Sequence, residues 1–166
     1  MAVSITNQPD AELSITRFCG EIEMAVVASW SRHRWISQRL DFPGMIESFP
    51  RTFQTRNLKV NGVTLYVRAG GQGSAVVMLH GFGDTGDMWA PVAAVLAKNH
   101  RVIVPDLRGM GLSSHPENGY DKKAQAHDIA AVMDKLKIEK AAFVTHDIGN
   151  MVGYAFAAQF PARVSR

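Results

Sequence analysis

The chain has 166 residues, of which 46% are hydrophobic and 20% are charged, a composition typical of one globular domain with a real core. The formal net charge is only +3, and the early arginines are scattered, so the sequence gives no sign of nucleic-acid binding. The longest early apolar run, residues 24–28, is far too short to span a membrane, and no signal peptide is recognisable. We therefore expect neither a nucleic acid nor a membrane as partner.

The single cysteine, Cys19, excludes an intramolecular disulfide. Because disulfides are rare in reducing compartments, we predict a cytoplasmic protein. No spacing of His, Cys, Asp or Glu is typical of a metal site. The sequence thus predicts no metal and no other cofactor.

The first 50 residues differ from the rest because they contain no recognisable motif. We predict that residues 1–50 are an N-terminal extension of unclear structure, with a short helix within residues 21–30, and that residues 51–166 belong to one domain. A further hypothesis is that residues 1–44 derive from a wrongly chosen start codon.

The first predicted elements of the domain are a β-hairpin and a series of buried strands. Residues 51–60 and 63–68 flank Asn61-Gly62, which is a strong signal for a two-residue turn. Three short apolar runs are typical of strands buried on both faces of a sheet. These runs are residues 75–79, 101–105 and 141–145.

Helices are predicted between and after these strands. Asp84 or Thr85 can cap the first helix, and Asp121 can cap the second. The inner face of the second helix is formed by Ile129, Val132, Met133 and Leu136. Residues 150–160 are apolar nearly all round, which predicts a buried third helix. Strands that alternate with helices predict an α/β fold with a parallel sheet.

One junction between strand and helix carries the main chemical signal, in residues 142–151. An apolar run ends there in a polar residue flanked by small ones, and a helical pattern begins at once. In the nucleophile elbow G-x-S-x-G, such a sharp turn presents a Ser for chemistry. The five corresponding residues here are Thr145-His146-Asp147-Ile148-Gly149. The tip is therefore the carboxylate of Asp147, a residue type that tolerates positive φ.

Two further motifs precede this elbow, and each follows an apolar run. They are His80-Gly81-Phe82-Gly83 and the run from Asp106 to Ser113. With the three motifs in this order, residues from about 53 to 166 resemble the α/β-hydrolase fold family. Within that family they are similar to the branch with an Asp nucleophile, which contains epoxide hydrolases and haloalkane or haloacid dehalogenases.

The resemblance implies an α/β-hydrolase core, in which helices flank a mostly parallel sheet. Numbered from the hairpin onward, the five strands should follow the order 1-2-4-3-5, with residues 141–145 on an exposed edge. Since an unpaired apolar edge promotes association with other chains, we expect the protein to be marginally soluble or self-associating.

The resemblance also assigns roles to the motif residues. Asp147 is expected to be the nucleophile, and the backbone N–H groups of Phe82 and Ile148 the oxyanion hole. The residues expected to support these loops are His80, Gly81, Gly83, Asp106, Arg108 and Gly149. We expect the His80 side chain to be packed and hydrogen-bonded, and we assign no general base to any histidine present. His146 should point away from the tip of the turn.

Two positions bear on the subclass. Haloalkane dehalogenases commonly have Trp directly after the nucleophile, whose indole N–H holds the leaving halide, and this chain has Ile148 there. This favours an epoxide hydrolase, which acts through an Asp-alkyl ester, over a dehalogenase. Epoxide hydrolases usually have Pro where this chain has Gly83, which leaves the subclass open. In either case the substrate is a small molecule that bears an epoxide or a halide.

In the resembled enzymes further strands, a helical cap and the catalytic His follow the part that residues 51–166 resemble. None of these is in the sequence. We therefore expect residues 51–166 to be the N-terminal part of such a domain, truncated before the cap and the C-terminal strands, and we expect the chain alone to lack turnover. The sequence leaves substrate identity and oligomeric state open.

Two other hypotheses remain at this point. Residues 81–86 fit the G-x-G-x-x-G fingerprint of a dinucleotide-binding Rossmann domain, and Asp106 follows Gly86 by 20 residues, where a ribose-binding acid is expected. The His before the first Gly, the hairpin and the elbow argue against this domain. The other alternative is an inactive fragment, because no catalytic base is identified.

Overall fold

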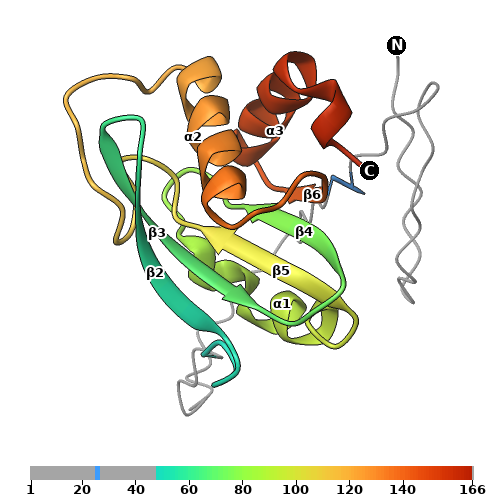
Figure 1. The fold of residues 1–166 in the computed structure, drawn as a ribbon. Coiled ribbons are helices and arrows are strands. Elements are labelled where there is room, and N and C mark those ends of the chain that lie inside the picture. Colours follow the sequence, from blue (N-terminus) through green and yellow to red (C-terminus); the bar gives the residue numbers. More distant parts are fainter. Residues whose placement is uncertain (1–24, 27–47, 166) are drawn as a thin grey trace, which may run out of the picture.

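A computed structural model describes residues 25–26 and 48–165 of the chain (Figure 1). Its strands are β1 (Ala25–Val26), β2 (Gln54–Val60), β3 (Val63–Gly70), β4 (Ser74–Leu79), β5 (His100–Pro105) and β6 (Ala141–Thr145). Its helices are α1 (Ala90–Leu96), α2 (Lys122–Lys135) and α3 (Ile148–Gln159), with 3-10 turns η1 (Gly86–Trp89) and η2 (Pro161–Arg163). The strands and helices predicted after residue 50 are present, with small shifts at their ends.

The six described strands form one mixed sheet in the order β1-β6-β4-β5-β3-β2. β4 lies between β5 and β6 and is parallel to both. β2 and β3 form an antiparallel hairpin, and β3 joins β5 in antiparallel orientation. The hairpin lies beside β5, whereas β6 lies on the far side of β4. The predicted order of the five strands after residue 50 is therefore confirmed.

The hairpin shows how a local signal sets the register of the sheet. Asn61 and Gly62 have φ values of 44° and 79°, the left-handed conformation that a two-residue type I′ turn requires. The turn leaves Val60 opposite Val63. Alternate residues of β3 then point into the core, because successive side chains of a strand face opposite sides of the sheet.

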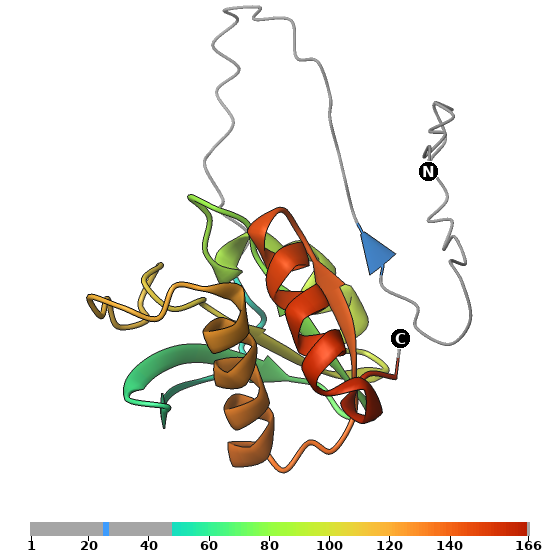
Figure 2. The same ribbon diagram turned by 90° about the horizontal axis from the view of Figure 1, so that it is seen from above.

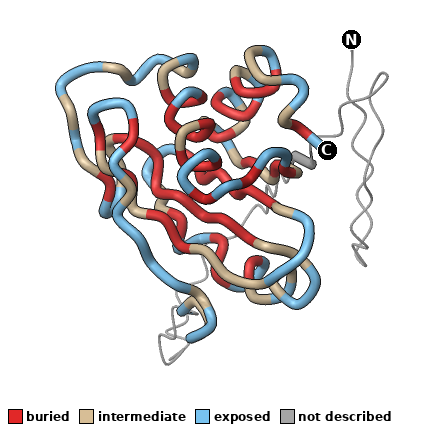
Figure 3. Tube along the Cα trace, viewed as in Figure 1, coloured by how far each residue is buried: buried red, intermediate tan, exposed pale blue. Residues whose placement is uncertain are grey.

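Helices cover both faces of the sheet, with α2 and α3 on one face and α1 on the other (Figures 1 and 2). The larger core lies under α2 and α3. Its fully buried side chains include Leu65, Leu79, Ile103, Ile129, Met133 and Phe156. The smaller core packs Trp89 and Ala93 against the other face. Figure 3 shows the buried segments concentrated in the central strands and the inner sides of the helices.

The prediction that the third helix is buried is wrong for its outer face. α3 buries Val152 and Phe156 but leaves Met151 and Tyr154 exposed, at 58% and 71% of their surface. An apolar helix is fully buried only when partners lie on every side. Among the residues that the structure describes, α2 and the sheet cover one side of α3, so apolar sequence alone overestimates its burial.

The outer edge of β6 is not fully exposed, in contrast to the sequence prediction. Residues 25–26 pair in parallel with residues 144–145, and Ala141 forms a single parallel bridge with Val164. Two short backbone segments therefore cover part of this edge. The helix predicted within residues 21–30 is also wrong at the two described residues, which form a strand, and the rest of that stretch lies outside the described residues.

Replacement of Phe156 by Ala tests the packing of α3. Phe156 is fully buried, and its ring centroid lies 4.6 Å from that of Phe143. Because the missing ring would leave a cavity between α3 and β6, Phe156→Ala should lower the free energy of unfolding by about 3–5 kcal/mol, measured by urea denaturation. Tyr154→Ala is the matched control on the exposed face and should change it by less than about 0.5 kcal/mol. Similar losses in both variants would contradict this packing.

Candidate active site

The candidate site lies at the carboxyl ends of the parallel strands. The chain passes from β4 to β5 on one side and then crosses to β6 on the other side of β4. The loops that leave these strands therefore diverge, and open α/β sheets bind ligands in the crevice formed at such a point. The three sequence motifs follow β4, β5 and β6, and hydrogen bonds connect residues from all three.

Asp147 occupies a strained turn between β6 and α3. Its φ and ψ are 48° and −118°, an unusual conformation for a residue other than glycine. Thr145 Oγ1 donates to Asn150 Oδ1 across the turn at 2.6 Å. Gly149 has to be small, because a Cβ there would lie 2.5 Å from the carbonyl oxygen of Leu79. A sharp turn is thus found where the sequence predicts it, and it presents an exposed carboxylate.

The loop after β4 holds this carboxylate. The backbone N–H of Phe82 donates to Asp147 Oδ2 at 2.7 Å. Hydrogen bonds from the backbone N–H groups of Phe82 and Ile148 lower the pKa of Asp147 below its ordinary value, because they stabilise the charged form. The side chain is therefore ionised at neutral pH. Both donors that the resemblance assigns to an oxyanion hole act on this one carboxylate.

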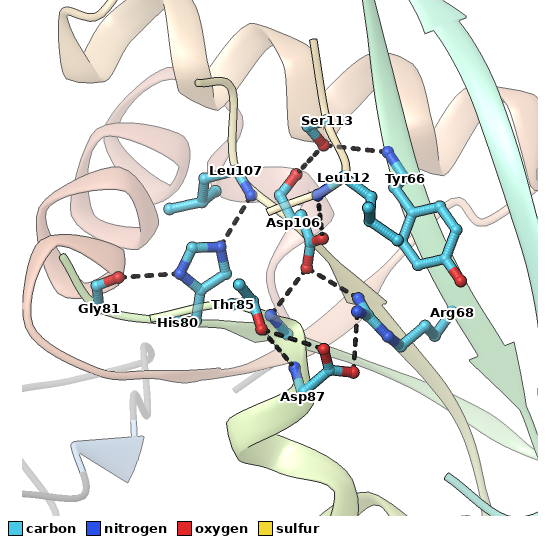
Figure 4. A network of polar contacts seen from close by, with 11 residues as sticks. Tyr66, Arg68, His80, Gly81, Thr85, Asp87, Asp106, Leu107, Leu112 and Ser113 are labelled. Carbon is cyan, nitrogen blue, oxygen red and sulfur yellow. Dashed lines mark hydrogen bonds and ion pairs between the residues drawn. The ribbon is translucent and has the colours of Figure 1, made fainter. Parts of the chain in front are cut away.

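His80 connects the loop after β4 with the loop after β5 (Figure 4). Its Nδ1 donates to the carbonyl oxygen of Gly81 at 2.8 Å, and its Nε2 accepts from the N–H of Leu107 at 2.9 Å. The ring is fully buried, and burial lowers its pKa, so a neutral ring with its proton on Nδ1 fits both partners. As predicted, the side chain is packed and hydrogen-bonded, and neither nitrogen is free to act as a base.

Asp106 lies at the end of β5, is fully buried and holds three segments together (Figure 4). Its Oδ1 accepts from Arg68 Nη1 at 2.7 Å and from the N–H of Gly86 at 2.8 Å. Its Oδ2 accepts from the N–H of Leu112 at 2.9 Å. Since both oxygens are engaged and buried, Asp106 is not available to a ribose hydroxyl. This removes the main argument for a Rossmann domain.

Arg108 fixes the loop after β5 to α2. Its Nε and Nη2 bind the two carboxylate oxygens of Asp128 at 2.7 and 2.8 Å, and this pairing raises the pKa of the guanidinium. Its Nη1 donates to the carbonyl oxygen of Asn118 at 3.2 Å. These contacts join the loop after β5 to α2 and do not involve the carboxylate of Asp147.

Sequence reasoning missed two members of this framework, Arg68 and Asp128. Arg68 also pairs with the exposed Asp87 at 2.8 Å, and Asp128 also accepts from Asn61 at 3.1 Å. The sequence signal for such a residue is a charge at a position expected to lie in the core, because charged residues are seldom fully buried unless they are paired. The partners of the two residues lie 38 and 20 positions away, so the sequence alone does not identify them.

The loop after β4 departs from the family pattern at Gly83. Gly83 has a φ of 76°, which proline cannot adopt because its ring fixes φ at about −65°. A Cβ at this position would meet no atom within 4 Å, so backbone conformation rather than crowding accounts for the glycine. A loop with Pro at this position has to follow a different path.

His146 lies close to the loop after β4. A Cβ on Gly81 would lie 2.7 Å from His146 Nδ1 and 3.0 Å from Asp147 Cβ. The imidazole Nδ1 and the Cβ of Asp147 therefore both lie next to this glycine. His146 Nδ1 is buried and has no hydrogen-bond partner among the described residues.

Other features of the described residues lie apart from this site. Residues 25–26 and 48–165 contain no group of three or more His, Cys, Asp or Glu side chains that could hold a metal ion. None of the described helices combines the length and apolar character needed to cross a membrane. A hollow lined by residues that include Arg56, Gly70 and Arg101 opens at the amino end of β5, whereas Asp147 lies at the carboxyl ends of the parallel strands.

Comparison with known proteins matches residues 74–166 to the alpha/beta hydrolase fold family. A fluoroacetate dehalogenase from Burkholderia sp is 38% identical over 117 residues, which are 68% of this chain and 38% of that protein. A soluble epoxide hydrolase from Corynebacterium sp. (strain C12) is 36% identical over 98 residues, which are 59% of this chain and 34% of that protein. The crystal structure of an epoxide hydrolase from Vigna radiata has a TM-score of 0.66 and 31% identity, covering 68% of this chain and 38% of that one.

The chain therefore spans little more than a third of the length of these relatives. It covers 34% of the soluble epoxide hydrolase and 38% of the fluoroacetate dehalogenase. The family match contains all three motifs, at His80, Asp106 and Asp147. The shared part is thus the sheet and the loops described above, while the named activities belong to longer proteins.

The contact between Phe82 and Asp147 predicts how the pKa of the carboxylate responds to substitution. Phe82→Pro removes the N–H donor and should raise the pKa of Asp147 toward its ordinary value, measured by NMR titration of the carboxyl carbon. Phe82→Ala keeps the donor and should leave the pKa low. Because the folded-state pKa is depressed, the associated stability is present above the unfolded pKa and is lost as pH falls through the folded value. The same pKa in both variants would contradict the hydrogen bond.

The buried position of Asp106 predicts that nicotinamide nucleotides do not bind. A ligand that binds the folded state raises the melting temperature by mass action. We expect NAD and NADP at millimolar concentration to leave the melting temperature unchanged in thermal denaturation. A saturable increase that disappears in Asp106→Ala, with that variant still folded, would restore the dinucleotide hypothesis.

Proposed function

Because the chain belongs to the α/β-hydrolase fold family, we propose that it supplies the nucleophile, Asp147, and the oxyanion donors of an enzyme that hydrolyses small-molecule epoxides. The observation that carries this proposal is the geometry of Asp147. Its carboxylate stands on a strained turn, is exposed, and is held by the N–H of Phe82 at 2.7 Å. The carboxylate is thus fixed in direction and accessible to a substrate.

In the proposed first step, Oδ1 of Asp147 attacks a carbon of the epoxide. The ring C–O bond breaks, and the departing oxygen takes a proton from an acid, which leaves a β-hydroxyalkyl ester on Asp147. The N–H of Phe82 already engages Oδ2, so Oδ1 is the oxygen assigned to the attack. Holding one oxygen restricts rotation of the carboxylate and orients the other oxygen toward the substrate.

In the proposed second step, water attacks the ester carbonyl and releases the diol. The oxygen that becomes negative is Oδ2, which is already next to the N–H of Phe82, and the N–H of Ile148 is the second donor. Loss of one such donor typically costs about 10²–10³ in rate. The oxyanion hole therefore acts mainly on this step.

The proposed reaction also needs an acid for the leaving oxygen and a base for water. By resemblance these groups belong to the cap and to a late His, which the relatives' additional length can accommodate. General acid–base help is typically worth about 10²–10⁴-fold, so we expect no multiple-turnover hydrolysis by the 166-residue chain alone. His80 does not replace the base, because both of its nitrogens are engaged.

A dehalogenase is the second candidate, supported by the fluoroacetate dehalogenase among the relatives. The same carboxylate would displace a halide from carbon and form the same kind of ester. Ile148 follows the nucleophile directly and has no side-chain donor to stabilise the leaving halide. This favours the epoxide over the halide as substrate.

The test of the nucleophile is covalent labelling of the chain. Prolonged incubation with excess styrene oxide should add one equivalent at Asp147. The ester forms slowly because the acid for the leaving oxygen is absent, and it persists because the base for its hydrolysis is absent. Mass spectrometry of the intact protein and of its peptides measures the extent and position of the label. The label should be absent from Asp147→Asn and unchanged in Asp134→Asn, since Asp134 is an exposed carboxylate on α2.

Labelling that persists in Asp147→Asn to the same extent would refute the assignment of the nucleophile. Stoichiometric release of bromide from 1-bromobutane, with no label from styrene oxide, would instead favour the dehalogenase. Both outcomes require that the variants keep the circular dichroism of the unmodified chain.

We further propose residues 51–166 as the N-terminal part of one hydrolase domain and residues 1–50 as an extension of it. The family match and strands β2 to β6 support this division, and the extension adds the two residues of β1 to the edge of the same sheet. A cytoplasmic location is proposed on the single cysteine of the sequence.

A further inference from the structure

The sequence contains two Asn-Gly pairs, and both contact the ion pair that holds the loop after β5. They are Asn61-Gly62, in the turn between β2 and β3, and Asn118-Gly119, in the loop before α2 (Figure 1). Asn61 Nδ2 donates to Asp128 Oδ1 at 3.1 Å. The carbonyl oxygen of Asn118 accepts from Arg108 Nη1 at 3.2 Å. One Asn-Gly pair therefore contacts the acid of the ion pair, and the other contacts the base.

An asparagine that precedes a glycine can lose its side-chain amide without an enzyme. The backbone nitrogen of the glycine attacks the side-chain carbonyl carbon, and its proton leaves with the amide group as ammonia. The product is a five-membered cyclic imide, which water opens to aspartate or isoaspartate. Glycine favours this reaction because it has no Cβ to hinder the approach of its nitrogen. Each event replaces a neutral hydrogen-bond donor with a carboxylate.

The turn at Asn61 is accessible to this reaction. Asn61 and Gly62 are both exposed. Strand pairing ends at Val60 and resumes at Val63, so the N–H of Gly62 takes no part in the ladder between β2 and β3. A Cβ on Gly62 would meet no atom within 4 Å. The attacking nitrogen is therefore open, while the hydrogen bond to Asp128 holds the side chain that has to rotate.

A carboxylate at position 61 would disturb the surroundings of Asp128. Asp128 is buried and accepts from three donors, which are Nε and Nη2 of Arg108 and Nδ2 of Asn61. Arg108 supplies one positive charge, which balances one carboxylate. Deamidation of Asn61 would replace a donor with an acceptor and place a second negative charge opposite Asp128 Oδ1. Burial strengthens the repulsion between these charges, because less water screens them.

The same reaction at Asn118 would place its charge beside the opposite partner. Asn118 is exposed, and its carbonyl oxygen accepts from Arg108. A Cβ on Gly119 would collide with Nη1 of the same guanidinium. A carboxylate formed at position 118 therefore arises near a positive charge rather than a negative one. Identical chemistry at the two sites should thus have different effects on the ion pair.

We propose that Asn61 is a site of spontaneous deamidation, and that the carboxylate formed there weakens the ion pair between Arg108 and Asp128. Deamidation of Asn118 leaves this pair intact. The loop that the pair holds contains the second sequence motif, from Asp106 to Ser113, so modification of Asn61 acts on the framework of the candidate site. Neither reaction requires the proposed hydrolase activity.

Peptide mapping tests the modification itself. The full chain is incubated in mildly alkaline buffer, and mass spectrometry measures aspartate and isoaspartate at each asparagine. We expect conversion at Asn61 and Asn118, more slowly at Asn61 because its side chain must first leave Asp128. Asn57 is the control and should stay intact, because it is exposed but precedes Leu58. Conversion at Asn118 with none at Asn61 would overturn the assignment of the site.

Substitutions test the effect on the ion pair. Asn61→Asp keeps the turn, since Asp-Gly also suits type I′, and should raise the equilibrium constant of unfolding in urea about tenfold, because a hydrogen bond to a charged group is lost. Asn118→Asp is the matched control and should leave it unchanged. Asn61→Gly removes the donor without adding a charge and should fall between the two.

The Nε–H of Arg108 provides a local measurement. Its exchange with solvent, followed by NMR, should accelerate in Asn61→Asp and stay at the wild-type rate in Asn118→Asp. Equal stability and equal exchange in these two variants would overturn the proposal. Equal losses in Asn61→Gly and Asn61→Asp would also overturn it, because the new charge would then have no effect on the ion pair.

Discussion

The buried carboxylate of Asp106 is the interaction on which the geometry of the site depends. It fastens β3 through Arg68, the start of η1 through Gly86, and the loop after β5 through Leu112. The loop that contains Phe82 runs from His80 to η1, so Asp106 fixes its exit while His80 fixes its entrance. Removal of one partner from a buried ion pair typically costs about 3–5 kcal/mol, because an uncompensated charge remains. The loop is thus held by a framework that is expensive to break.

This framework also accounts for the persistence of a strained residue. Conformations such as that of Asp147 typically cost about 1–3 kcal/mol and survive only where the surroundings determine them. Here β6 and α3 are joined by the bond between Thr145 and Asn150, and Gly149 packs against the carbonyl of Leu79. Neither contact depends on the charge of Asp147. The contacts that hold the strained turn are therefore made by groups other than the carboxylate, which allows the carboxylate to remain exposed.

Much of the fold could be predicted because its signals are local. Asn61-Gly62 defines the hairpin, and apolar runs between capped helices define β4, β5 and β6. The strained turn at Asp147 and the bonds of His80 also follow from motifs of a few residues. The partners of Arg68 and Asp128, the exposed side of α3 and the position of β1 could not be predicted. Each of these depends on which segments meet in space, and neither periodicity nor spacing along one chain contains that information.

The hydrogen bond from Phe82 has opposite effects on the two steps of the proposed reaction. By lowering the pKa of Asp147, it keeps the carboxylate ionised, but it also stabilises the charge that must attack carbon and so makes the oxygen less reactive. In the ester, the same N–H faces the oxygen on which negative charge develops, and there it lowers the barrier. Strained three-membered rings are reactive toward weak nucleophiles, whereas alkyl esters are slow to hydrolyse in water. A site with this arrangement accelerates hydrolysis of the ester, which is the step that needs more help. It therefore suits an epoxide better than a substrate with a poor leaving group.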